Sequence, residues 1–412
     1  MFGSEKPPEV KAGIEDADAS GRTALVTGST SGLGRAAALA LGRLGADVIV
    51  HGRNREAGET VVADLEAVGS DARFVAADFE KPAEVSALAE TVRNEVDDLD
   101  VLCNNAGGRF EDNAETEPGV GRTFHINHLS PYQLTVELLP VLGDGAQVVT
   151  TASVGHRIAT LNLDRLAEMT GLSSWAAYCR SKLANILFAS ELSRRLVAAG
   201  RDVTSNSLHP GIVPGSEFSR ALPDPAPQIG RLIGEFPTTD SVEDGAATIV
   251  YRAVSDDVEG VTGKYFAQCR ERRPAPDAVD AEAGRELWAR SADLLGIEEP
   301  LAETAAPRGP ARPAAGRTSV SPHAPEFDRL DPHLEAGAVA QDRVGCRRGQ
   351  AGRLEQRVRP NRRVDGRHLP RLARDAPDDQ RVVAGRAGPR ERRPTLSRRD
   401  EVAVPLDTER RN

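Results

Sequence analysis

The sequence predicts an α/β protein whose core is a Rossmann-type, doubly wound parallel sheet with helices on both faces. Two observations point to this fold class. Short apolar runs alternate with longer amphipathic stretches from residue 22 to residue 268, and a glycine-rich turn follows the first apolar run. Strands joined by helical crossovers form a parallel sheet, because each crossover returns the chain to the same edge. We expect a flexible segment at 1–21, one folded domain at 22–299 and a disordered tail at 300–412.

The expected strands and helices alternate strictly along the folded domain. The strands are Thr23–Thr27, Asp47–Val50, Arg73–Ala77, Asp100–Cys103, Gln147–Thr151 and Val203–Leu208. The helices are Leu33–Leu44, Glu56–Val68, Pro82–Val96, Gly121–Leu142, Trp175–Ala199 and Ala278–Leu295. The third helix has a clear start signal, because Pro82 lies in its first turn and Glu84 lies near the positive end of its dipole.

The apolar pattern ends after Pro300. Residues 301–412 contain 24 Arg, no Lys and one aromatic residue, Phe327. Such a segment cannot bury enough apolar surface to offset the entropy of ordering the chain, so we expect disorder. A basic arm for nucleic acid and an out-of-frame translation of GC-rich DNA both explain this composition. We favour a dispensable segment, because acids dilute the Arg and platforms for base stacking are almost absent.

Charge and composition narrow the function classes. The net charge is −10, and it divides into +8 for residues 301–412 and −18 for residues 1–300. An acidic body repels polyanions, so we expect no nucleic acid on the folded domain. The same body holds only five Lys, which either salt adaptation or GC-rich codon usage explains.

The location is expected to be cytoplasmic. The chain has no apolar run of 18 or more residues, no secretory signal at its N-terminus and four scattered cysteines. These features predict no membrane span, no disulfide framework and no Cys-rich zinc module. A homo-oligomer is compatible with the sequence.

The glycine-rich turn predicts a phosphate-binding loop. Its glycines let the backbone approach a pyrophosphate, and the following helix N-terminus offers oriented N–H groups. The next strand ends in His51-Gly52-Arg53-Asn54 without the acid that accepts a bond from the ribose of NAD. Arg53, with Arg35, would instead clamp a 2′-phosphate. This favours NADP(H), the alternative being that Arg53 is a solvated loop residue.

Tyr178 and Lys182 are the candidate acid/base pair. They are four residues apart in a helical stretch and so lie on one face. A phenol needs its pKa lowered by about 3 units, or about 4 kcal/mol, to act as a base at neutral pH. An ammonium about 4 Å away supplies roughly that energy at an effective dielectric of 20. By itself the spacing also fits a surface pair.

Other polar residues are expected at the same edge of the sheet. Ser153 follows the fifth strand and Asn104-Asn105-Ala106-Gly107 follows the fourth, at the carboxyl ends where ligands bind in open α/β folds. Asn127 lies inside a predicted helix, where Asn is mildly unfavourable and therefore needs a reason.

With these motifs, residues 22–296 resemble the short-chain dehydrogenase/reductase family, most of all its retinol-dehydrogenase-like branch. The family motifs are the Thr-Gly-x-x-x-Gly-x-Gly loop at 27–34, Asp78, Asn-Asn-Ala-Gly at 104–107, Asn127, Ser153, Tyr178 with Lys182, and Pro210-Gly211. The branch likeness lies in Tyr178–Leu196, Gly263–Phe266 and Leu287-Trp288. The chain departs at Ala152, where Ser is frequent, and it lacks the membrane anchor common in vertebrate relatives.

The resemblance implies an NADP(H)-dependent oxidoreductase that interconverts a carbonyl and an alcohol. Tyr178 would exchange the proton, Ser153 would orient the substrate oxygen, Lys182 would lower the Tyr178 pKa and bind the nicotinamide ribose, and Asn127 would hold a water of the proton relay. Asp78 would contact adenine, Asn104 the adenosine ribose and Pro210–Val213 the nicotinamide amide. The cofactor-binding set is Gly28, Thr30, Ser31, Gly32, Leu33, Gly34, Arg53, Asn54, Asp78, Phe79, Asn104, Ala106, Gly107, Tyr178, Lys182, Pro210, Gly211 and Val213.

The substrate is expected to be small and hydrophobic. The family has its substrate-covering segment at about 212–241, and this stretch is rich in Pro and interrupted by apolar residues. The alternative is a loop that only packs over the sheet edge. His125, His128 and His156 are expected to be core histidines and not metal ligands. A non-catalytic NADP(H)-binding sensor or scaffold is the alternative function, although such relatives typically lose Tyr or Lys.

Overall fold

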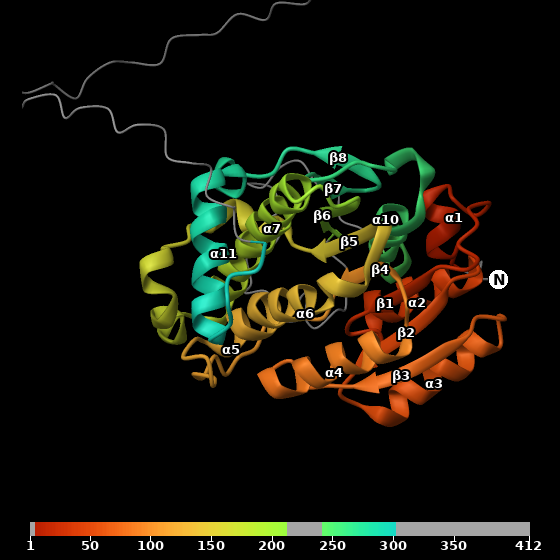
Figure 1. The fold of residues 1–412 in the computed structure, drawn as a ribbon, viewed down its shortest axis with the longest axis horizontal. Helices are drawn as coiled ribbons and strands as arrows, with labels where there is room; N and C mark the ends of the chain where they lie inside the picture. Colours follow the sequence, from red (N-terminus) through yellow and green to blue (C-terminus); the bar gives the residue numbers. More distant parts are fainter. Residues whose placement is uncertain (1–4, 212–240, 302–412) are drawn as a thin grey trace, which may run out of the picture. The chain divides into compact units, whose positions relative to one another are not determined.

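A central sheet of eight strands organises the protein in the computed structural model, which describes residues 5–211 and 241–301 (Figure 1). The strand order is β3-β2-β1-β4-β5-β6-β7-β8, and each neighbouring pair is parallel except β7 with β8. The prediction of a doubly wound parallel sheet is therefore confirmed. The strands are β1 (Thr23–Val26), β2 (Asp47–Gly52), β3 (Ala72–Ala76), β4 (Leu99–Asn104), β5 (Leu142–Thr151), β6 (Val203–His209), β7 (Tyr265–Ala267) and β8 (Arg270–Arg272).

Helices cover both faces of this sheet. Side chains alternate along a strand, so Ala24 and Val26 of β1 pack into one apolar layer while Leu25 packs into the other. The first layer includes α2 (Gly32–Arg43), α3 (Arg55–Glu66) and α10 (Val242–Val254). The second layer includes α4 (Pro82–Glu95), α6 (Ser130–Leu138), α7 (Ser174–Ala198) and α11 (Ala281–Leu295). Among the described residues, no helix combines the length and the apolar character that crossing a bilayer requires.

The expectation of a flexible N-terminal segment is wrong for residues 5–21. A short helix, α1 (Pro8–Ala12), packs against α10, and Ala19 behind it is fully buried. Buried Glu9 binds Arg43 of α2 through two hydrogen bonds of 2.6 and 2.8 Å. Lys11 lies 2.9 Å from the Asp244 carboxylate at the start of α10. Contacts of Glu9 and Lys11 with residues far away in the sequence therefore hold this polar segment on the fold.

The helix expected at Gly121–Leu142 is interrupted. It consists of α5 (Arg122–Phe124), one π-helical turn (His125–Leu129), α6 and a 3₁₀ turn (Leu139–Val141), after which β5 begins. A π turn is rare and often lies at a functional site. Here it contains Asn127, the residue whose position inside a helix was unexplained.

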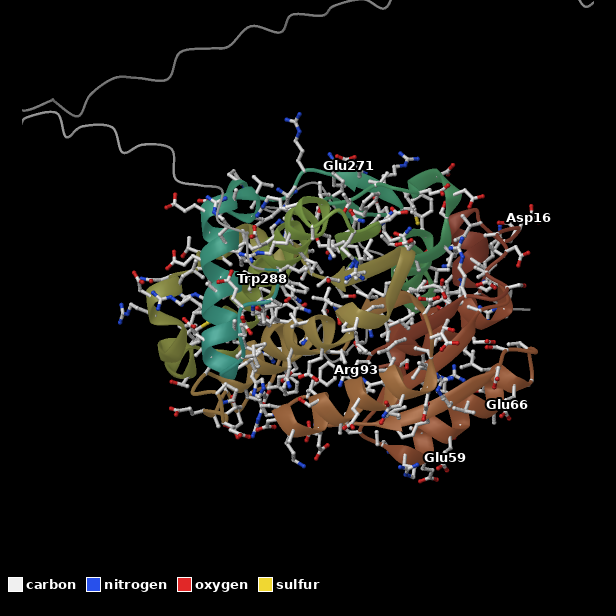
Figure 2. The ribbon with its side chains drawn as sticks, viewed as in Figure 1. Asp16, Glu59, Glu66, Arg93, Glu271 and Trp288 are labelled. Carbon is white, nitrogen blue, oxygen red and sulfur yellow. The ribbon has the colours of Figure 1, made fainter. Side chains whose placement is uncertain are left out.

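The folded part extends slightly beyond the predicted boundary at residue 299. Trp288, labelled in Figure 2, lies on α11. Its ring stacks on Phe188 of α7 at 5.9 Å between ring centroids, and its indole Nε1–H donates to the Pro300 carbonyl at 3.1 Å. The buried Arg195 guanidinium donates to the Leu301 carbonyl at 3.1 Å. Pro300 and Leu301 therefore belong to the fold. The rest of the predicted tail, from residue 302, lies outside the described residues.

Stability should fall steeply on mild acidification. All five described histidines are buried, and burial lowers their pKa values from 6.5 to between about 3 and about 4. Below about pH 6.5 the histidines of the unfolded chain bind protons, whereas the buried histidines of the native protein stay neutral. The free energy of unfolding therefore decreases as the pH falls toward 4, by up to about 1.4 kcal/mol per histidine and pH unit. Urea unfolding between pH 7.5 and pH 5 measures this loss.

A single substitution separates the loss of stability caused by histidines from the loss caused by carboxylates, which titrate at lower pH. In His128→Asn, which keeps a donor for Ser291, the stability lost between pH 6.5 and pH 5 should be smaller than in the wild type by about 2 kcal/mol. A wild-type stability that stays constant down to pH 5 would contradict the neutral state assigned to these side chains.

The contribution of the Pro300 and Leu301 carbonyls to the free energy of unfolding should be measurable. A chain that ends after Glu299 should be less stable to urea than one that ends after Leu301, by about 1–3 kcal/mol, because the buried donors of Arg195 and Trp288 lose their acceptors. Both truncated chains lack residues 302–412, so the comparison reports on Pro300 and Leu301 alone. Equal stabilities would show that these two hydrogen bonds contribute nothing.

Candidate active site

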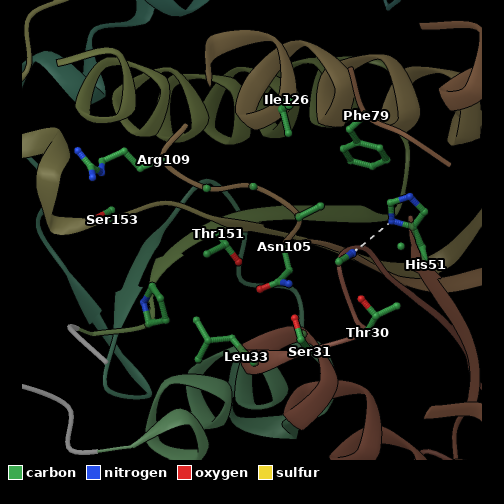
Figure 3. A pocket seen from close by; sticks show the side chains of 18 of the residues that line it. Thr30, Ser31, Leu33, His51, Phe79, Asn105, Arg109, Ile126, Thr151 and Ser153 are labelled. Carbon is green, nitrogen blue, oxygen red and sulfur yellow. Dashed lines mark hydrogen bonds between the residues drawn. The ribbon is translucent and has the colours of Figure 1, made fainter. Parts of the chain in front are cut away.

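A cavity of about 690 Å³ lies at the carboxyl ends of the parallel strands (Figure 3). The strand order reverses between β1 and β4, and ligands of open α/β sheets bind at such a point. The cavity is lined by the predicted site residues Gly28, Thr30, Ser31, Gly32, Leu33, Gly34, Arg53, Asp78, Phe79, Ala106, Gly107, Ser153, Tyr178, Lys182, Pro210 and Gly211. Asn54, Asn104 and Asn127 do not line it, and Val213 lies outside the described residues together with 212–240.

The loop between β1 and α2 forms a cradle that only glycines permit. Gly28 and Gly32 have φ angles of 65° and 53°, in the left-handed region that disfavours other residues. A Cβ on Gly34 would lie 2.3 Å from the Gly28 carbonyl oxygen. The Ser31 side chain makes no capping hydrogen bond, so the first N–H groups of α2 stay available to a ligand. Backbone N–H groups at a helix N-terminus are suited to a phosphate.

A histidine that sequence analysis did not select holds this loop. His51, near the end of β2, accepts a hydrogen bond from the Gly28 N–H at its Nδ1 (3.2 Å), and its Nε2 lies 3.2 Å from the Ala77 carbonyl (Figure 3). Its ring stacks on Phe79 at 4.6 Å. Burial lowers the pKa of His51 to about 4, so the ring is neutral. Its place two residues before Arg53 was the available signal.

The two arginines proposed for a 2′-phosphate have different surroundings. Arg53 lines the cavity and is exposed, as a ligand-binding residue at its rim would be. Arg35 forms an ion pair with Asp64 of α3 at 2.5 Å and does not line the cavity. Asn54 caps α3 by accepting from the Ala57 N–H at 3.1 Å. Of these three residues, the structure leaves Arg53 as the candidate.

Asn105, and not the predicted Asn104, lines the cavity at the end of β4. Asn104 is buried behind the cavity and donates to the Thr135 hydroxyl at 2.8 Å. Asn105 lines the cavity instead, and its Nδ2 donates to the Thr27 carbonyl at 2.9 Å. The prediction that Asn104 contacts an adenosine ribose therefore does not fit the structure. Successive residues of a strand point to opposite faces, so an error of one residue moves the side chain to the other side.

The Asn127 side chain is hydrogen-bonded to the protein backbone. Its Oδ1 accepts from the Gly108 N–H at 2.8 Å, and its Nδ2 donates to the Gly108 carbonyl and to the Ser181 hydroxyl, both at 2.9 Å. Both amide hydrogens are thus used by protein groups. The carboxamide joins the π turn, the segment after β4 and α7, and so positions these elements. Its role in holding a water of the proton relay stays a prediction of the resemblance.

Tyr178, Lys182 and Ser153 lie together at one end of the cavity. Tyr178 and Lys182 share a face of α7, and the Lys182 Nζ lies 5.6 Å from the centroid of the Tyr178 ring. The same Nζ donates to the Thr151 carbonyl at 3.0 Å, at the end of β5. Ser153 follows two residues later, and its side chain is hydrogen-bonded to Tyr178. The structure therefore brings together three of the four predicted catalytic residues at the cavity, and the fourth, Asn127, lies behind its lining.

The pKa values differ from the sequence expectation. Burial raises the pKa of Tyr178 above its ordinary value of 10, although the hydrogen bond from Ser153 opposes this shift. Burial also lowers the pKa of Lys182 from 10.5 to about 8. Burial of the phenol thus shifts the pKa of Tyr178 in the direction opposite to the lowering that the sequence predicted from Lys182. At neutral pH the site holds a neutral phenol next to a protonated amine, which is an arrangement for donating a proton.

The three histidines considered as metal ligands are buried in the described core. The His156 Nδ1 lies 2.6 Å from the Ser153 carbonyl, and the His128 Nε2 lies 3.0 Å from the Ser291 hydroxyl. Residues 5–211 and 241–301 contain no cluster of His, Cys, Asp or Glu that could hold a metal ion.

Comparisons with known proteins match the part of the chain that builds this cavity. A family model described as short chain dehydrogenase matches residues 22–225. The chain is similar to polyprenol dehydrogenase of Mus musculus, with 39% identity over 67% of this chain and 84% of that protein. It is also similar to human retinol dehydrogenase 13, with 35% identity over 68% and 86%. A solved structure of an uncharacterized protein from Mycobacterium Paratuberculosis is similar with a TM-score of 0.57 and 30% identity, over 69% of this chain and 97% of that one.

Proposed function

The chain belongs to the short-chain dehydrogenase/reductase family, in its retinol-dehydrogenase-like branch, and on this premise we propose that it is an NADP(H)-dependent enzyme that interconverts a carbonyl compound and an alcohol. It is an oxidoreductase acting on CH–OH groups, like the dehydrogenases to which it is similar. The observation that carries the proposal is the buried Tyr178–Lys182 pair, with Ser153 beside it, at one end of a cavity whose other end is a glycine cradle.

The residues present fit a dinucleotide phosphate. A Cβ on Gly28 would lie 2.9 Å from the Ala106 Cα, so a side chain does not fit at this position. The loop therefore presents its backbone to the cavity. The N-terminus of α2 would hold the pyrophosphate, Asp78 and Phe79 would flank the adenosine, and Arg53 would bind the 2′-phosphate. Bound NADPH would supply the hydride, for which the protein has no donor of its own.

The chain's own residues would supply the proton. Tyr178 would donate its phenolic proton to the substrate oxygen while the carbon receives the hydride, so the carbonyl becomes an alcohol. Ser153 would hydrogen-bond the same oxygen and hold it in position. Lys182, with a pKa of about 8, is protonated at neutral pH and would stabilise the phenolate that remains.

The substrate is proposed to be small and largely apolar. This proposal rests on the composition of about 212–241 and on the retinol and polyprenol in the names of the relatives.

A cytoplasmic location and a homo-oligomer also stay predictions of the sequence. The test is NADPH consumption with a panel of aliphatic and aromatic aldehydes and ketones, followed at 340 nm. If no member of a broad panel is reduced, the chain is better described as an NADP(H)-binding sensor or scaffold.

Tyr178→Phe should abolish turnover and leave NADPH affinity within a few-fold of wild type, since only the transferable proton is removed. Steady-state rates and fluorescence titration with NADPH measure the two properties separately. If the variant kept more than about a tenth of the wild-type kcat, Tyr178 would not be the proton donor.

Arg53→Ala should weaken binding of NADPH more than binding of NADH, because only NADPH carries the 2′-phosphate. The expected difference is about 1.5–3 kcal/mol, the range for hydrogen bonds to charged groups. Arg55→Ala is a matched control, since Arg55 is an exposed residue of α3 that pairs with Glu59 and does not line the cavity. An equal loss for both cofactors in Arg53→Ala would remove Arg53 from cofactor selection.

A further inference from the structure

The catalytic end of the cavity is positively charged although the protein is acidic. The net charge is −10, and carboxylates such as Asp16, Glu59, Glu66 and Glu271 lie at the periphery (Figure 2). Among the described residues that line the cavity, the charged ones are Arg53, Asp78, Arg109 and Lys182. Asp78 and Arg53 follow β3 and β2, several strands away from β5 and α7. The catalytic end therefore contains two cations, Arg109 and Lys182, and no lining acid from the described chain.

Arg109 has a largely enclosed guanidinium whose Nε–H is buried without a hydrogen-bond partner in the described chain. Its side chain is 12% exposed. One terminal nitrogen donates to the Ser174 hydroxyl at 2.9 Å. The Nε–H has no partner within the described chain, and the nearest carboxylate, on Glu111, is 3.8 Å away and 91% exposed. A guanidinium has five N–H donors, and a buried charge without a counter-ion is costly.

The fold holds Arg109 in this place. Gly108 precedes Arg109, and the Asn127 carboxamide is hydrogen-bonded to its N–H at 2.8 Å and to its carbonyl at 2.9 Å. These two bonds fix the position at which the Arg109 backbone begins. Ser174, to which the guanidinium is bonded, begins α7 and lies one helical turn before Tyr178. Figure 3 shows Arg109 on the same side of the cavity as Ser153. The guanidinium is thus held about one turn from the proposed proton donor.

We propose that Arg109 is a specificity-determining residue that binds an oxyanion of the substrate, either a carboxylate or a phosphate, beyond the carbonyl that is reduced. This rests on the proposed function and narrows the substrate class to carbonyl compounds with an apolar body and an anionic end. The planar fork of Arg matches such groups with two parallel hydrogen bonds. The Nε–H and the second terminal nitrogen of Arg109 are the donors available for that pairing. With a neutral substrate, the counter-ion that the described chain offers within 4.0 Å is the exposed Glu111 carboxylate, 3.8 Å away.

The test compares substrates that differ only at the far end. A series of straight-chain ω-oxo carboxylates is assayed beside the corresponding methyl esters and ω-oxo alkyl phosphates, with NADPH and the full chain. In the wild type, kcat/KM for the best anion should exceed that for its neutral partner by at least tenfold. The carboxylate and phosphate arms identify which oxyanion the site prefers.

The variants assign this preference to Arg109. In Arg109→Gln the anion-to-ester ratio of kcat/KM should fall to near 1 with little change for the ester, and Arg109→Lys should keep part of the preference. Arg180→Gln, which removes a charge from α7 outside the cavity lining, should leave the ratio unchanged. A wild-type ratio near 1 for every chain length, or equal losses for acids and esters in Arg109→Gln, would overturn the proposal.

A binding measurement keeps this result separate from the proposed function. If neither anions nor esters are reduced, the proposed function fails, and calorimetry with hexanoate and hexanamide on the NADP⁺-saturated protein decides the role of Arg109. Hexanoate should bind at least tenfold more tightly than hexanamide to the wild type and not to Arg109→Gln. Equal binding of the two would refute an oxyanion site.

Discussion

The active site depends on one buried ammonium. Lys182 Nζ is bonded to the Thr151 carbonyl at 3.0 Å, and this contact joins α7 to the end of β5. Since α7 carries Tyr178 and the chain after β5 carries Ser153, this bond helps to set the relative positions of the three side chains, together with the bond from Asn185 Nδ2 to the same carbonyl at 3.1 Å. Burial lowers the pKa of this amine from 10.5 to about 8, which disfavours its charged form by about 3 kcal/mol. A phenolate that develops on Tyr178 would stabilise the ammonium.

A second constraint positions what lies around this centre. The π turn places the Asn127 carboxamide between Gly108 and Ser181, so the segment after β4 is tied to the middle of α7. On the other side of the cavity, neutral His51 ties the glycine loop to the ends of β2 and β3. Polar groups buried and fully bonded in this way rigidify a site, and a rigid site does not have to reorganise during the reaction.

The sequence predicted the parts of this site that depend on local spacing. The glycine loop follows directly from residues 27–34, and the Tyr178–Lys182 face follows from a separation of four residues in a helix. Features set by distant contacts were not predictable. Burial of Tyr178 comes from several elements, so the direction of its pKa shift was wrong. The side chains of Asn104 and Asn105 differ only in strand parity, and the ordered segment at 5–21 depends on Arg43 and Asp244, which are far away in the sequence.

The proposed function requires that one cavity holds the nucleotide at its glycine cradle and the reacting carbon at Tyr178. A crystal structure of the full chain with NADP⁺ tests this requirement. We expect the pyrophosphate against residues 28–34, the 2′-phosphate beside Arg53 and the nicotinamide next to Tyr178 and Lys182. A dinucleotide bound elsewhere, or one whose nicotinamide lies away from Tyr178, would show that the cavity does not serve both purposes.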